Sequence, residues 1–250
     1  MDEGRYSEEE KEKVMMNLLE SYENVMSENK ELKEMNQRDS QTGLYNSDKF
    51  YEDLKTSVSR ADRFEEEISL VVLDLDNFKA VNDIYGHCKG DEVIGKVADK
   101  LSSDSRDYDK AFRYGGDEFT VILEGIDEDE TLNFVERIYD DILSDEVWEG
   151  VDRDMVDYDV SIGIASYDGG SEVNKESISK ALTHMADKAM YNSKESYQNK
   201  ASIARYNNMF FRAFGTEESF GDENLPLDFE EVNIGEETVE YQGNLSTHTA

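Results

Sequence analysis

The sequence predicts a single α/β or α+β domain built on a mixed sheet. Stretches rich in strand-forming residues alternate with amphipathic helical stretches from about residue 40 to residue 206, an order typical of these fold classes. A β-hairpin signal at 110–123, in which Gly-Gly separates two strand-like runs, requires at least one antiparallel pair. The sheet therefore cannot be purely parallel.

Residues 1–36 form the first segment, where we expect a helix because the stretch is charged and holds no Gly or Pro after Gly4. Leu18, Val25 and Leu32 recur every seven residues, and Val14 and Met35 extend this apolar seam. Two interpretations of the seam remain open. The helix is either a short parallel coiled coil that joins two copies or a solvated helix that packs on its own domain.

The domain proper is expected at 37–207. A turn-rich stretch at 39–46 precedes a helix near 47–62, which Ser47 can cap. The aliphatic run at 68–73 predicts a strand buried on both faces. We then expect a short helix at 77–85, a loop at 86–91, a helix from Asp91, the hairpin, a helix near 128–144, a strand at 157–167, a helix near 176–196 and a short strand at 202–206.

Four acidic residues stand at the ends of two of these elements. Asp74 and Asp76 end the buried strand, and because strand residues two apart point the same way, they share a face. Asp117 and Glu118 follow Gly115-Gly116 at the hairpin turn, where the two glycines are expected to supply positive φ angles. A charged hairpin tip is the plainer alternative. If the two strands are neighbours, however, the carboxylates converge on a hard cation, Mg²⁺ or Mn²⁺, of the kind that carries substrate phosphates.

The overall charge limits the classes of partner. A net charge of -34, with 60 acidic against 26 basic residues, argues against a nucleic acid or an anionic membrane as the main partner. A nucleotide remains compatible, because a metal ion can neutralise its phosphates locally. The single Cys88, the acidic N-terminus and the absence of a long apolar run predict a cytoplasmic protein with no membrane insertion. The acidic stretch at 208–250 is expected to be disordered.

The ordered motifs resemble the GGDEF family of diguanylate cyclases. The resemblance spans about 39–206 and is carried by the motifs at 39–46, 73–79, 82–91, 113–119, 161–165 and 186–194. It implies a palm-like fold similar to that of adenylyl cyclases, and condensation of two GTP into cyclic di-GMP by a homodimer.

The resemblance also implies roles for individual residues. Asp74, the Leu75 carbonyl and Asp117 match the family's metal ligands. Asp117 and Glu118 match its catalytic acids, of which Asp117 is also expected to assist deprotonation of the 3′-hydroxyl. The remaining matches concern the substrate and the product: Gly115 and Gly116 lie against phosphates, Asn82 and Asp91 read guanine, Lys79 and Lys194 contact phosphates, and Arg106 with Asp109 forms an inhibitory product site. For Arg106 and Asp109 a surface ion pair is the alternative.

Two departures from the family pattern leave a second function open. Gln41 stands where the family usually has leucine, close to the expected guanine pocket. Tyr197 and Gln198 replace the usual Gly-Arg and remove a phosphate-side cation. The alternative to an active cyclase is therefore a catalytically weak domain that binds GTP or cyclic di-GMP and signals through its helix or tail.

Overall fold

The computed structural model describes residues 8–35, 37–106, 109–170, 174–195, 201–205 and 229–232. The helices are α1 (Glu8–Met35), α2 (Ser47–Phe64), α3 (Phe78–Tyr85), α4 (His87–Asp104), α5 (Glu128–Ile142) and α6 (Lys175–Glu195). The strands are β1 (Ile68–Asp76), β2 (Lys110–Arg113), β3 (Glu118–Glu124), β4 (Asp159–Tyr167), β5 (Ala201–Arg205) and β6 (Phe229–Val232).

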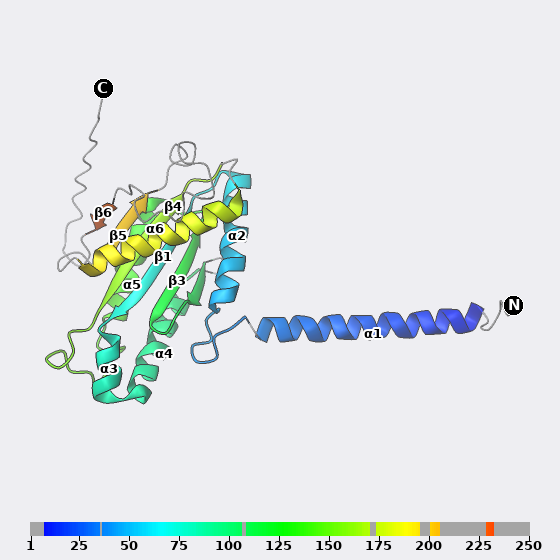
Figure 1. The fold of residues 1–250 in the computed structure, drawn as a ribbon, viewed down its shortest axis with the longest axis horizontal. Coiled ribbons are helices and arrows are strands. Elements are labelled where there is room, and N and C mark those ends of the chain that lie inside the picture. The colour runs from blue at the N-terminus through cyan, green and yellow to red at the C-terminus, as the bar shows by residue number, and fades with distance from the viewer. Residues whose placement is uncertain are drawn as a thin grey trace, which may run out of the picture.

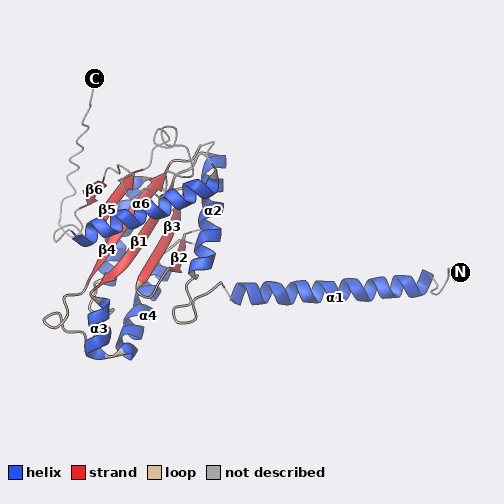
Figure 2. Cartoon of the chain, viewed as in Figure 1, coloured by secondary structure: helices blue, strands red, loops and turns tan. Residues whose placement is uncertain are grey.

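The strands form one mixed sheet in the order β2-β3-β1-β4-β5-β6. All neighbouring pairs are antiparallel except β4 and β5, which are parallel. Helices α2 and α6 cover one face of the sheet, and α3, α4 and α5 lie on the other (Figures 1 and 2). The predicted mixed sheet flanked by helices is confirmed.

The two faces of β1 serve two different cores. All nine of its residues are buried. Val71, Leu73 and Leu75 belong to the core under α4 and α5, whereas Ile68, Leu70 and Val72 pack beneath α2 and α6. Side chains alternate along a strand, so the even-numbered Asp74 and Asp76 continue the face that α6 covers. This alternation directs the acids toward α6.

Gly163 fixes how closely α6 approaches the sheet. It lies in the middle of β4, and a Cβ added there would stand 2.0 Å from the Ala186 carbonyl oxygen and 2.2 Å from the Met190 nitrogen. Both atoms are helix backbone, so no side chain can rotate away. The helix that carries Lys194 therefore rests directly on the central strands.

We expect Gly163→Ala to lower the free energy of unfolding by about 3 kcal/mol, because α6 must lift from β4. Gly95→Ala is the matched control, since nothing lies within 4 Å of a Cβ at this position of α4; it should stabilise the helix by roughly 0.5–1 kcal/mol. Urea unfolding monitored by circular dichroism measures both. Equal stabilities of the two variants would contradict the close approach of α6.

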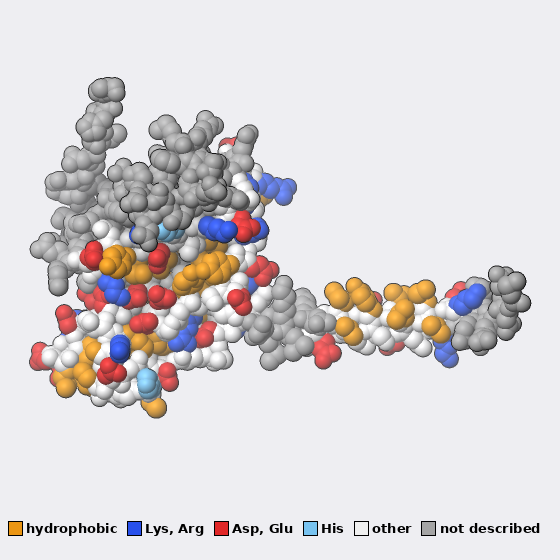
Figure 3. Space-filling model, in the orientation of Figure 1, with side chains coloured by type: hydrophobic (Ala, Val, Ile, Leu, Met, Phe, Trp, Pro, Cys, Tyr) orange, Lys and Arg blue, Asp and Glu red, His pale blue; other side chains and the backbone are white. Residues whose placement is uncertain are grey.

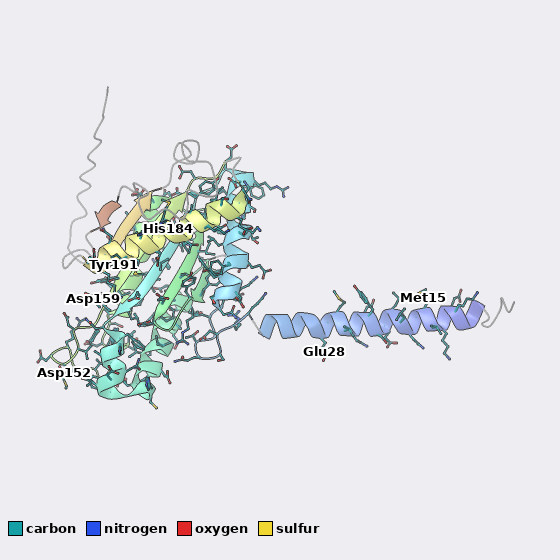
Figure 4. The ribbon with its side chains drawn as sticks, in the orientation of Figure 1. Met15, Glu28, Asp152, Asp159, His184 and Tyr191 are labelled. Atoms are coloured by element: carbon teal, nitrogen blue, oxygen red, sulfur yellow. The ribbon has the colours of Figure 1, made fainter. Side chains whose placement is uncertain are left out.

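Helix α1 extends away from the sheet domain (Figure 1). Its seam residues Val14, Leu18 and Val25 are 62%, 63% and 53% exposed, and Figure 3 shows apolar side chains along this helix. Met15 and Glu28 likewise project from α1 with no other element beside them (Figure 4). The side chains of Leu32 and Met35 lie outside the described residues. In the described part of α1, the helix does not pack on its own domain.

Two regions differ from the expectation. Helix α4 begins at His87, so most of the loop predicted at 86–91 is helical. Gly90, expected within that loop, is buried in the helix, and a Cβ there would stand 2.1 Å from Asn82 Oδ1. Within 208–250 the structure describes β6, which pairs with β5 and was not predicted. No helix in the described ranges has the length and apolar character needed to cross a membrane.

Candidate active site

The carboxylates predicted on β1 and on the hairpin lie on adjacent strands. β1 and β3 pair so that Asp74 stands opposite Glu118, and the Leu75 nitrogen donates to the Asp117 carbonyl oxygen at 3.3 Å. Asp74 and Asp76 are only 8% and 6% exposed. The structure thus brings Asp74, Leu75, Asp117 and Glu118 together at one end of the sheet.

Lys194 supplies positive charge to this group of acids from α6. Its Nζ lies 2.5 Å from Asp74 Oδ1 and 3.9 Å from Asp76 Oδ1. The Ser161 hydroxyl of β4 contacts both Asp76 carboxylate oxygens, at 3.0 and 2.9 Å. One lysine therefore faces two aspartates, with Asp117 and Glu118 close by.

The pKa values of the side chains in this site are shifted by the crowding of negative charge. Burial raises the pKa of Asp74, and the nearby Asp117 and Asp76 raise it further, although Lys194 opposes both effects. Burial also raises the pKa of Glu118, with added repulsion from Asp74, Asp117 and Asp187. Burial would lower the pKa of Lys194, but its hydrogen bond to Asp74 and the negative charges of Asp74, Asp76 and Asp117 together outweigh that effect and raise it. The site thus favours an additional cation.

The predicted backbone conformation of the hairpin turn is wrong. Neither Gly115 nor Gly116 has a positive φ. The turn is wider than the two-residue type, because the Tyr114 and Gly115 nitrogens both donate to the Glu118 carbonyl oxygen, at 2.9 and 3.1 Å. Gly115 instead leaves room for the Glu118 carboxylate, since a Cβ there would stand 2.3 Å from Glu118 Oε2. Gly116 has open space around it.

Four of the six expected substrate contacts line a cleft beside the hairpin, and Gly115 and Lys194 are not among its lining residues. This cleft measures about 420 Å³, and its walls come from α3, α4 and the turn. Asn82 and Asp91, the expected guanine contacts, line it together with Lys79, Gly116 and Asp117. Phe78 and Ile94 add apolar surface. The cleft therefore joins the predicted base-binding residues to the hairpin acid Asp117, with Asp74 in the adjacent strand.

Arg113 organises the turn, a role that was not predicted from the sequence. Its guanidinium donates to the carbonyl oxygens of Gly115 at 3.1 Å and Gly116 at 2.8 Å. It also donates to Asp39 Oδ1 at 3.0 Å and to Gln41 Oε1 at 2.7 Å. The position of Arg113 two residues before Gly115 was the available signal, since turn carbonyls need donors.

A second, smaller pocket contains the predicted inhibitory residues. Arg106 and Asp109 line a cavity of about 190 Å³ together with Glu130 and Arg137. The Arg106 backbone nitrogen donates to Asp109 Oδ2 at 3.0 Å. Asp109 Oδ1 is buried and has no hydrogen-bond partner among the described residues. Burial raises the pKa of Asp109, against the effect of that hydrogen bond. Arg137 was not predicted here, and it brings a second guanidinium to the pocket.

The donor set of the acidic site suits a hard divalent cation. No three His, Cys, Asp or Glu side chains converge as a metal site within the ranges the structure describes. The predicted ligand set needs only two carboxylates and the Leu75 carbonyl, with the remaining positions left to phosphate oxygens and water. This is the usual arrangement for Mg²⁺. The oxygen-only donors and the excess of negative charge fit Mg²⁺ or Mn²⁺.

Comparison with protein families matches residues 36–200 to "Diguanylate cyclase, GGDEF domain". The chain belongs to the GGDEF family. This GGDEF domain is 34% identical over 139 residues to diguanylate cyclase A of Treponema denticola, covering 56% of this chain and 36% of that protein. It is 32% identical over 166 residues to diguanylate cyclase DgcM of Escherichia coli, and the match covers 66% of this chain and 38% of that protein. The matched segment is thus less than two fifths of the length of either relative.

Solved structures of GGDEF proteins share the fold. The coiled coil and GGDEF domain of DgcB from Caulobacter crescentus, in complex with c-di-GMP, aligns with a TM-score of 0.62 at 25% identity, covering 78% of this chain and 98% of that one. Diguanylate cyclase SiaD of Pseudomonas aeruginosa, in complex with its activator SiaC, aligns with a TM-score of 0.58 at 27% identity. The alignment covers 78% of this chain and 72% of that one. The palm-like fold predicted from the motifs is confirmed.

Proposed function

We propose that this GGDEF domain condenses two GTP molecules into cyclic di-GMP and releases two pyrophosphates. One observation carries the proposal: the paired ends of β1 and β3 join Asp74, Asp117 and Glu118 to a cleft lined by Asn82 and Asp91. A metal-suited carboxylate group beside a base-sized cleft is what nucleotidyl transfer requires.

In this proposal the cleft selects guanine. The Asp91 carboxylate accepts hydrogen bonds from guanine N1–H and N2–H, a pair of donors that adenine lacks. Asn82 contributes an amide with both donor and acceptor groups. Lys79 is exposed at the cleft and Lys194 lies beside Asp74, and in the proposal both contact phosphate oxygens.

Asp74, the Leu75 carbonyl and Asp117 would hold Mg²⁺ or Mn²⁺, which supplies neutralisation of phosphate charge when bound. The 3′-oxygen of one GTP attacks the α-phosphorus of the other, a new P–O bond forms, and the bond to pyrophosphate breaks. Asp117 assists removal of the 3′-hydroxyl proton, and Glu118 adds negative charge beside it. The step occurs twice, so each cyclic di-GMP releases two pyrophosphates.

Because one domain offers one such cleft, two copies must face each other. Residues 1–36 then act as the dimer scaffold, residues 37–207 as the catalytic domain and residues 208–250 as a tail. The exposed apolar side chains of α1 support a parallel coiled coil. A coiled coil is also present in the DgcB structure. The cytoplasmic location stays a prediction.

The pocket of Arg106 and Asp109 is the proposed site of product inhibition. Arg106 and Arg137 supply forked donors suited to guanine O6 and N7 or to phosphate. Asp109 Oδ1, which has no hydrogen-bond partner in the part of the chain that the structure describes, offers an acceptor for a guanine N–H. The DgcB structure holds c-di-GMP, which supports a product site in this family.

Arg106→Ala is expected to relieve inhibition by cyclic di-GMP at least about tenfold while leaving the initial rate unchanged, because a charged hydrogen-bonding group is lost from a site remote from the carboxylates. Initial rates measured against added cyclic di-GMP give the inhibition constant. Arg63→Ala, at the C-terminal end of α2, is the control. Unchanged inhibition in Arg106→Ala would remove the product site from the proposal.

The reaction itself is tested by incubating the purified protein with GTP and Mg²⁺ and separating the nucleotides. We expect cyclic di-GMP and pyrophosphate in a ratio of one to two, and no cyclic product from ATP. Tight GTP binding without product would instead support the nucleotide-binding module.

A further inference from the structure

Gln41 connects the base end of the cleft to the hairpin. Its Nε2 donates to Asp91 Oδ1 at 2.9 Å, and its Oε1 accepts from Arg113 at 2.7 Å. The amide orientation is determined by its neighbours, because a carboxylate only accepts and a guanidinium only donates. We infer that Gln41 is a positioning residue for guanine recognition, acting through Asp91. This inference rests on the proposed function.

Asp91 needs such a partner. Its side chain is exposed near the start of α4, and within the described residues Gln41 is its one side-chain hydrogen-bond partner. An exposed aspartate otherwise samples several rotamers, and fixing one of them when a ligand binds costs conformational entropy. A carboxylate already held in place binds its ligand more tightly, since that cost has been met before binding.

The contact with Gln41 leaves Asp91 able to bind guanine. An ionised carboxylate has two oxygens and about four lone-pair sites. Gln41 uses one site on Oδ1, so Oδ2 and the second lone pair of Oδ1 remain available for N1–H and N2–H. Orientation by Gln41 and recognition of the base are therefore compatible.

The other side of the amide is held just as firmly. Arg113 binds the carbonyl oxygens of Gly115 and Gly116 and the carboxylate of Asp39. A continuous chain of hydrogen bonds thus runs from Asp91 through Gln41 and Arg113 to the turn before Asp117. The leucine that is usual at this position in the family can make neither bond.

The test is Gln41→Leu, measured with GTP and with ITP, which keeps N1–H but lacks the 2-amino group. We expect the KM for GTP to rise about tenfold with kcat unchanged, and the preference for GTP over ITP to fall about fivefold. Gln41→Glu should raise KM further, because it still accepts from Arg113 but places a like charge against Asp91. In an Asp91→Ala background, Gln41→Leu should have no added effect.

Gln37→Leu is the matched control, since it makes the same chemical change in the same loop but its amide donates to Glu52 on α2. An unchanged KM and unchanged GTP preference in Gln41→Leu would overturn the inference and leave the proposed function standing, and so would a loss confined to kcat. Titration calorimetry with GTP gives an independent readout. A wild-type protein that binds GTP without turnover contradicts the proposed reaction alone, and weaker binding by Gln41→Leu then still supports the inference. A wild-type protein that binds no GTP overturns both.

Discussion

Replacing Asp117 with alanine is expected to lower cyclic di-GMP formation by about three orders of magnitude. The side chain lines the cleft between the base contacts and the carboxylates of β1, and in the proposed reaction it both holds the metal and assists the 3′-hydroxyl. The fold should survive, because the bond from the Leu75 nitrogen goes to the Asp117 backbone carbonyl. Initial rates and a thermal unfolding curve measure the two effects.

Asp99→Ala is the matched control for Asp117→Ala, since it removes an exposed carboxylate from α4 outside the cleft. It should keep the wild-type rate and a wild-type melting temperature. An Asp117→Ala variant that retains more than a small part of the activity would refute the catalytic role of the hairpin acid. An unfolded variant would refute the claim that the acid is dispensable for the fold.

Asp74→Asn is expected to abolish turnover to a similar extent and, unusually for a buried substitution, to raise the melting temperature without metal. Burial raises the pKa of Asp74 even though Lys194 lies beside it. A carboxyl whose pKa is raised in the folded state is ionised at neutral pH at a cost to stability. The amide has nearly the same shape and avoids that cost, and Lys194, whose side chain is 42% exposed, can be solvated.

The melting temperature is measured in EDTA and again with Mg²⁺ and GTP. Only the wild type should be stabilised by the ligands, because a neutral amide in place of the carboxylate is a poor metal ligand. Asp53→Asn provides the opposite case: that carboxylate is buried but paired with Lys49 at 2.8 Å and Lys110 at 3.1 Å, so its loss should destabilise the fold and spare turnover. If Asp74→Asn lowered the melting temperature as much as Asp53→Asn does, the result would contradict the claim that the ionised Asp74 carboxylate costs stability.

Local pattern was enough to predict most of the fold. The aliphatic run ending in Asp74-Leu75-Asp76 predicted a buried strand, and the strand is fully buried from Ile68 to Asp76. Acids two residues apart were expected on one face, and Lys194 approaches both of them. These features follow from the period of two in a strand and need no knowledge of distant residues.

Glycines were interpreted less well, because a sequence does not show what stands beside them. Gly90 was expected within a loop, and the Gly115-Gly116 pair was expected to supply positive φ angles at a turn. In the structure Gly90 and Gly115 make room for the side chains of Asn82 and Glu118. Close approach and positive φ select the same residue for different reasons.

The contacts made by Gln41, Arg113 and Arg137 were not predictable for a related reason. Gln41 reaches residues 50 and 72 positions away, and Arg137 joins the pocket of Arg106 from α5. Such pairings depend on the packing of whole elements, which local periodicity does not contain. Single polar residues in loops therefore carried little signal before the fold was known.

The central claim is that cyclic di-GMP forms between two copies of this chain, each holding one GTP. It is tested most directly by the initial rate of cyclic di-GMP formation per chain, measured over protein concentrations that span the monomer and the dimer, with mass photometry at each point. We predict that the rate per chain falls toward zero as the dimer dissociates, while GTP binding persists. A rate per chain that stays constant in samples holding only monomers, or no cyclic di-GMP at any concentration, would contradict the claim.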